Sequence, residues 1–182
     1  MDNNPYSVGR ETSSTANGLP GPKAEAMVRI MQIIAAALMM GVLALLFVVL
    51  LVTRGDIGGM QNADLITMIA GGSGFLMIVN HLVIPGIITR AQLKQAAASG
   101  ILQKEEQAKI EHFCAIYQTQ MIIGLALLEG AAFFNLIALM VEKSVASLGV
   151  VILLLSLMLL KFPTRDKVSF WVQDKLREMQ LM

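Results

Sequence analysis

Charged residues are scarce in this chain. Its 182 residues are 55% hydrophobic and only 15% charged, with a mean hydropathy of +0.67, whereas a soluble domain carries about 25% charge. Four long apolar stretches with two tails and short connections use up the length, so no room remains for a separate catalytic domain. The deficit of charge predicts an all-α integral membrane protein whose main partner is the lipid bilayer.

Cysteine and histidine are also rare. Cys114 is the only cysteine, so the chain cannot form an intrachain disulfide, and His81 and His112 stand far apart. The sequence shows no Ser/His/Asp set, no paired carboxylates at one site and no cluster with metal-ligand spacing. We therefore expect no metal, no cofactor and no enzymatic activity. We also expect no nucleic-acid partner.

Residues 1–26 carry no apolar periodicity. They are rich in Asn, Ser, Thr, Gly and Pro, and they cannot bury enough surface to offset the entropy of ordering, so we expect a disordered cytoplasmic tail. They do not resemble a secretory signal, which has a short basic start followed directly by a short apolar core. The first apolar stretch is therefore expected to be an uncleaved signal-anchor.

Four apolar stretches are long enough to cross a bilayer, which takes about 20 residues of helix. They lie within a predicted four-helix transmembrane domain at 27–162, and cover about 30–52, 65–88, 120–141 and 145–162. The fourth is the shortest, and it stops at Pro163.

Small residues mark the first two spans. Ala37 and Gly41 have small-xxx-small spacing, which lets another helix approach closely; ordinary helix composition is the alternative. The second span contains Gly71–Gly74 and Pro85, which membrane helices tolerate when neighbours satisfy the freed backbone groups. We therefore expect this span to be buried against other spans rather than to face lipid all round.

The two longest polar segments are also expected to be helical. Residues 89–119 predict two helical segments interrupted near Gly100, which would form a solvated cytoplasmic connection rather than a binding site. Residues 163–182 carry side chains at the spacing of an amphipathic helix that lies at the membrane interface, with Trp171 as its anchor at headgroup depth. The face is made of Val168, Trp171, Val172, Lys175, Leu176 and Met179.

Basic residues are distributed unequally along the chain. Of 14 Lys and Arg, all but Arg54 and Lys143 fall before the first span, in the 89–119 connection, or from Lys161 to the C-terminus. Basic residues near span ends favour the cytoplasmic side. Both termini and the connection are therefore expected in the cytoplasm, across a cytoplasmic (inner) membrane. Two ends on one side require an even number of spans.

Glu129 lies near the middle of the third span. A carboxylate there costs on the order of 3 kcal/mol if the insertion value for Asp applies, and such groups usually face protein and find a partner. Asn80 and His81 lie at nearly the same depth in the second span. Two interpretations stay open: a hydrogen-bonded cluster that fixes helix register, or an ion-binding site of Glu129, His81 and Asn80. Asn135 points elsewhere and is expected to serve a different neighbour.

One stretch resembles a known family. Gln118 and Thr119, followed by Ile122–Ala132 (IIGLALLEGAA), are similar to the ion-binding helix of rotary ATP synthase c-subunit proteolipids. That family pairs a Gly-rich helix with a helix that carries one mid-membrane carboxylate. Here Gly71–Gly74 and Glu129 lie on the second and third spans in the same order. The resemblance implies that Glu129 takes up and releases H⁺ or Na⁺, although this chain has two further spans and a longer connection.

Two functional hypotheses follow from these patterns. The first is a structural or interaction subunit of the cytoplasmic membrane that forms a homo-oligomer or joins a membrane complex, with its connection and tails as docking surface. The second is a proteolipid-like subunit that binds or translocates H⁺ or Na⁺ through Glu129. Both require the four-span frame.

Overall fold

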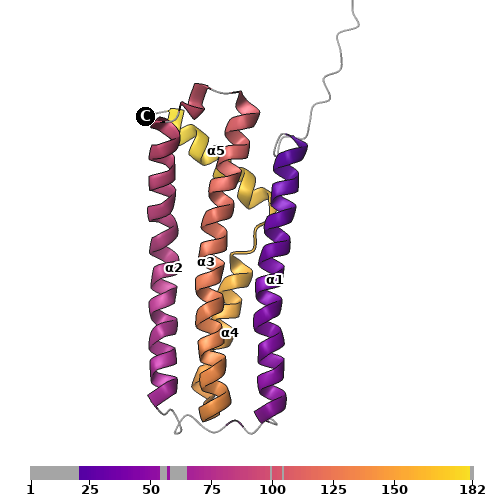
Figure 1. The fold of residues 1–182 in the computed structure, drawn as a ribbon, viewed down its shortest axis with the longest axis vertical. Coiled ribbons are helices and arrows are strands. Elements are labelled where there is room, and N and C mark those ends of the chain that lie inside the picture. The colour runs from indigo at the N-terminus through magenta and orange to yellow at the C-terminus, as the bar shows by residue number, and fades with distance from the viewer. Residues whose placement is uncertain (1–20, 54–56, 58–64, 99, 104, 181–182) are drawn as a thin grey trace, which may run out of the picture.

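The chain folds into four helices that run alongside one another and a fifth that crosses one end of the bundle (Figure 1). The computed structural model describes residues 21–53, 57, 65–98, 100–103 and 105–180. Its elements are α1 (Pro22–Thr53), α2 (Leu65–Ala98), the short 3-10 helix η2 (Ile101–Gln103), α3 (Glu106–Glu142), α4 (Val145–Leu160) and α5 (Arg165–Gln180). No strand occurs in these residues, and the all-helical prediction is confirmed.

The outer surface of the bundle is apolar. Three helices are long and apolar enough to cross a membrane. A fourth span is added if the bent pair of α4 and α5 is counted as one. On α2 the exposed apolar side chains run from Leu65 to Ile87, about 33 Å at 1.5 Å per residue, which matches a hydrocarbon core of ~30 Å. Large exposed side chains elsewhere include Ile33, Phe47, Phe134, Ile152 and Leu159. The chain is therefore a multi-pass membrane protein.

Helix α3 is at the centre of the bundle. Half of the most apolar 18-residue segment of α3 is buried inside the protein, whereas the corresponding segments of α1 and α2 are 17% and 22% buried. Leu128, Leu136 and Leu139 of α3 are completely buried, and the helix contacts α1, α2, α4 and α5. The stretch with the candidate carboxylate is thus the one that the other helices surround.

Several helices extend beyond the predicted spans. Residues 22–26, expected to be disordered, form the first turn and more of α1, which starts on Pro22, a residue suited to the first helical position; residues 1–20 lie outside the described residues. Helix α2 continues through Pro85 to Ala98. The connection is interrupted at Gly100, where φ is 69°, as predicted. The apolar pattern therefore locates the membrane-crossing part of each helix rather than its ends.

A carboxylate closes the N-terminus of α2. The backbone N–H groups of Ile66 and Thr67 donate to Oε1 and Oε2 of Glu142, at 2.8 and 2.7 Å. These N–H groups have no partner within their own helix, and the positive end of the helix dipole favours a negative charge there. The hydroxyls of Thr67 and Ser147 are also hydrogen-bonded, at 3.2 Å. This end of the bundle thus joins α2, α3 and α4.

The last predicted span is broken. Helix α4 has 16 residues and is about 24 Å long, shorter than the ~30 Å hydrocarbon core. Pro163 cannot continue a helix, and α5 leaves at 67° to α4. We call residues 161–164 the elbow. It is held to α1 by a hydrogen bond from Nε2 of Gln32 to the carbonyl of Pro163, at 3.1 Å.

Helix α5 is amphipathic, as predicted, but its apolar face packs on α3 and α1. Val168 and Val172 are buried and Trp171 is half-buried, whereas Phe170 is 75% exposed. Phe170 is therefore the large apolar side chain that α5 exposes, and the role of Trp171 as a headgroup anchor stays a prediction. The start of α1 and the end of α5 lie at the same end of the bundle (Figure 1), as an even number of spans requires.

Candidate functional site

His81 of α2 lies against Gly124 of α3. Its Nδ1–H donates to the carbonyl oxygen of Gly124 at 2.9 Å, and the side chain is only 8% exposed. A Cβ added at Gly124 would lie 3.0 Å from the ring atoms Nδ1 and Cε1, closer than nearly all real contacts. The glycine therefore allows the imidazole to reach the backbone, and the pair holds α2 to α3.

Asn135 of α3 makes a second contact with α2. Its buried Nδ2 donates to the carbonyl of Ala70 in α2, at 3.1 Å, and to that of Ala131 in its own helix, at 2.9 Å. A Cβ on Gly74 would lie 3.3 Å from Nδ2 of Asn135 and 3.2 Å from a methyl group of Val150 in α4. Asn135 therefore bonds to α2, the span that was expected to serve Glu129 rather than Asn135.

The rest of the glycine run has a different environment. A Cβ added at Gly71 or Gly72 would meet nothing within 4 Å, so these positions face outward. Only the last glycine of the run, Gly74, packs against other helices, and α2 is buried on one side.

Glu129 turns toward α1. A Cβ on Gly41 would lie 3.2 Å from Oε1 of Glu129, so the carboxyl occupies the space that a side chain at Gly41 would need. Helices α1 and α2 lie on opposite sides of α3 (Figure 1), so Glu129 and His81 point to different neighbours. Within the described part of the chain, no hydrogen bond or ion pair links Glu129 to His81 or to the half-buried Asn80. The single cluster anticipated from their depths is not formed.

Small residues surround Glu129 at the surface. Ala37 and Ala44 precede and follow Gly41 by one turn of α1, and both are exposed; Ala126, one turn before Glu129 on α3, is exposed as well. We call Ala37, Gly41, Ala44, Ala126 and Glu129 the α1–α3 seam. Gly41 of the small-xxx-small pattern therefore contacts α3, whereas Ala37 and Ala44 stay accessible from outside.

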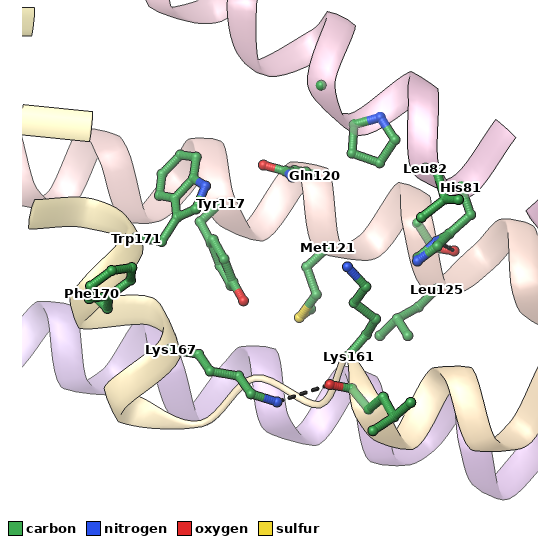
Figure 2. Close-up of a pocket in the computed structure, with 14 residues that line it drawn as sticks. His81, Leu82, Tyr117, Gln120, Met121, Leu125, Lys161, Lys167, Phe170 and Trp171 are labelled. Carbon is green, nitrogen blue, oxygen red and sulfur yellow. Dashed lines mark hydrogen bonds between the residues drawn. The ribbon is translucent and has the colours of Figure 1, made fainter. Parts of the chain in front are cut away.

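A cavity of about 540 Å³ lies between α2, α3 and the elbow (Figure 2). We call it the elbow pocket. Its polar lining includes His81 of α2, Tyr117 and Gln120 of α3, and Lys161 and Lys167 beside the elbow. The pocket is thus lined by the end of α4 and by the first turn of α5.

Two of these side chains are partly used by the fold. Nζ of Lys167 donates to the carbonyls of Leu160 and Phe162, at 2.9 and 3.3 Å, and so satisfies the end of α4. Oε1 of Gln120 accepts from the hydroxyl of Thr89 at 2.8 Å, which leaves its amide N–H groups for other partners.

Aromatic residues form the wall of the pocket between α3 and α5. The rings of Tyr117 and Trp171 meet edge to face, with centroids 5.3 Å apart. Trp171, predicted as a headgroup anchor, thus packs on α3 and lines the elbow pocket. The pocket went unnoticed in the sequence, although the short fourth span with a lysine at its end and Pro163 behind it is a signal that could have indicated it.

The single cysteine offers no reactive group. Cys114 is buried in the part of α3 that precedes the apolar stretch. Burial, with a smaller contribution from the negative charge of Glu111, raises the pKa of its thiol to about 11. The thiol therefore stays protonated at neutral pH and is a poor nucleophile.

The site residues do not indicate a metal centre or a known family. Among the described residues, no group of three or more His, Cys, Asp or Glu could hold a metal ion. Comparison with protein-family profiles, curated proteins and solved structures finds no match to this chain. The resemblance to c-subunit proteolipids therefore depends on the stretch around Glu129 alone.

Proposed function

We propose that the protein is a structural or interaction subunit of the cytoplasmic membrane, without enzymatic activity, and that the α1–α3 seam is its contact with another chain. One observation carries this proposal: the Glu129 carboxyl accepts no hydrogen bond from any described residue. Ionisable groups inside membranes normally pair, and this chain does satisfy the donor groups of His81 and Asn135. The partner of Glu129 is then a donor supplied from outside the described part of the chain.

The seam has the shape that such a contact needs. Membrane helices associate through small residues that let backbones approach closely, and polar side chains then hydrogen-bond across the interface. Ala37, Ala44 and Ala126 provide the small surface, and Glu129 provides the acceptor at its centre. The partner is a second copy of this chain or another membrane subunit.

The cytoplasmic end adds a docking surface to this proposal. Helix α2 continues about 16 Å beyond Ile87, and α3 begins about 21 Å before Gln120, at 1.5 Å per residue. These extensions expose polar and charged side chains, among them Arg90, Lys94 and Glu106. Such a projection supports the role of an interaction subunit.

A pair of alanine substitutions tests the seam. Ala44→Leu fills the seam from the outside, whereas Ala36→Leu adds the same bulk to an exposed position on another face of α1. In mild detergent extracts of native membranes, we expect Ala44→Leu to reduce the native-gel mass of the complex and Ala36→Leu to leave it unchanged. Equal masses for the wild-type chain and both variants would reject the seam as the contact.

An ion-binding subunit is the second candidate, because an unpaired mid-span carboxyl is also what a proton or sodium carrier presents. It predicts that a carboxyl-reactive carbodiimide labels Glu129 in a pH-dependent way, with protection by Na⁺ if sodium is the ion. It also predicts that Glu129→Gln abolishes H⁺ or Na⁺ transport. An interaction subunit, by contrast, keeps its complex in this variant, because the amide oxygen still accepts a hydrogen bond. Absence of labelling at every pH would eliminate the carrier.

A further inference from the structure

We propose that the elbow pocket binds the phosphate-bearing headgroup of an anionic membrane lipid. This inference is independent of the α1–α3 seam, because it concerns the opposite side of α3 and a different set of side chains. It starts from the charge of the pocket: two lysines, Lys161 and Lys167, line it, and none of its lining residues is an Asp or Glu. Basic pockets between membrane helices on the cytoplasmic side are suited to anionic headgroups.

The pocket also retains hydrogen-bond donors that the described chain does not use. Nζ of Lys161 has no acceptor among the described residues, and Nζ of Lys167 uses two carbonyls and keeps a third hydrogen. The amide of Gln120 and the hydroxyl of Tyr117, both on α3, also line the pocket. Several donors around one cavity without a carboxylate fit the oxygens of a phosphate group.

The mouth of the pocket indicates an amphiphile rather than a soluble anion. Three apolar residues from three different helices line it: Leu82 of α2, Leu160 of α4 and Phe170 of α5, which are 68%, 70% and 75% exposed. These side chains belong to the same outer surface that faces the bilayer. A lipid can therefore place its headgroup among the lysines and leave its acyl chains along this surface.

The depth of the pocket fits a headgroup. Counted from Leu65, the start of α2, His81 lies about 24 Å and Thr89 about 36 Å along the helix, at 1.5 Å per residue. A hydrocarbon core of ~30 Å that begins at Leu65 ends between these residues. His81 lines the pocket, and Thr89 bonds to Gln120 at its other end, so the pocket extends across the boundary between acyl chains and headgroups.

Trp171 provides a direct measurement, because it is the only tryptophan and it lines the pocket. The full chain would be reconstituted in phosphatidylcholine vesicles that contain rising fractions of brominated phosphatidylglycerol or, separately, brominated phosphatidylcholine. Bromine quenches tryptophan fluorescence on contact. We expect Trp171 to be quenched at a lower mole fraction of the anionic lipid than of the zwitterionic one.

Three variants assign that preference to the pocket. Lys161→Gln should weaken the preference about fivefold, the effect of one lysine near an anionic surface. Lys161→Arg should keep it, which excludes misfolding as the cause. Lys94→Gln removes the same charge from an exposed position on the α2 extension and should leave the preference unchanged.

Other results would overturn the proposal. Equal quenching by the two lipids, or the same loss in Lys94→Gln as in Lys161→Gln, would show general surface attraction and no headgroup site. Displacement of the brominated anionic lipid by millimolar glycerol phosphate or inorganic phosphate would show that the pocket takes a soluble phosphate compound and not a lipid.

Discussion

The two sides of α3 are joined to their neighbours in different ways. Toward α2, hydrogen bonds of His81, Asn135, Thr89 and Glu142 connect the two helices at four levels. Toward α1, an ion pair between Lys23 and Glu111, at 3.9 Å, joins the helices outside the apolar stretches. Within the apolar stretches the described helices share no hydrogen bond, and Glu129 only lies against Gly41. The polar side chains on the first side therefore bond α2 to α3, although Oδ1 of Asn135 stays buried without a partner among the described residues. On the second side, the carboxyl of Glu129 bonds to no described residue.

The strongest test of this difference is Asn135→Asp. The substitution removes the amide donor and places carboxylate oxygens against the carbonyls of Ala70 and Ala131. An unpaired buried charge of this kind costs about 3 kcal/mol or more, which we expect to see as a lower unfolding free energy in detergent titrations. Part of the loss should return at low pH, because a protonated carboxyl can donate one hydrogen bond. A variant as stable as the wild-type chain would contradict the structural role of Asn135.

Gly124→Ala should have the next largest effect. The added methyl group meets the His81 ring at 3.0 Å, and the ring is held by its own hydrogen bond to the same residue, so we expect a loss of about 1–3 kcal/mol from overpacking. Gly130→Ala, on the same helix with nothing within 4 Å, is the matched control and should not destabilise. Equal effects of the two substitutions would mean that close helix approach at Gly124 is unimportant.

Glu142→Ala should have a local effect. It removes the carboxylate that accepts the N–H groups of Ile66 and Thr67, and we expect faster amide hydrogen exchange at the start of α2 with little change in α1. Glu106→Ala, at the exposed other end of α3, serves as the control. Unchanged exchange at Ile66 and Thr67 would show that water satisfies these groups equally well.

Glu129→Gln should have the smallest effect on folding. This substitution changes an acid to an amide, the reverse of Asn135→Asp. Unlike Asn135, however, Glu129 has no hydrogen-bond partner in the described chain. We expect the unfolding free energy to stay within about 0.5 kcal/mol of the wild-type value, as for a substitution away from structural features. A large destabilisation would show that Glu129 belongs to the fold after all.

The sequence was sufficient to predict the helices and their membrane-crossing parts, because an apolar run of span length has few other solutions. It did not give the helix ends. Pro22 and Ala98 lie in polar segments that continue helices already formed by packing. Composition alone does not show that these polar segments are helical. The fourth span was predicted to 162, but Pro163 ends α4 at Leu160.

The site was predicted only in part. Depth along a helix can be counted from the sequence only approximately: His81 lies level with Gly124, about 7.5 Å from Glu129 along α3 at 1.5 Å per residue. Their neighbours depend on how the helices are arranged around α3, and that arrangement follows from matches such as Gly41 with Glu129 and Gly124 with His81. The elbow pocket requires the 67° bend after α4, which brings Lys161 and Lys167 to one cavity.

Photo-cross-linking from position 126 tests the central claim most directly, since Ala126 is exposed one turn from Glu129. A photoreactive amino acid incorporated there, with irradiation in native membranes, should give a covalent adduct with a second polypeptide chain, either a copy of this protein or another subunit. An adduct with lipid alone, at full occupancy of the label, would contradict the claim that the α1–α3 seam is covered by another chain.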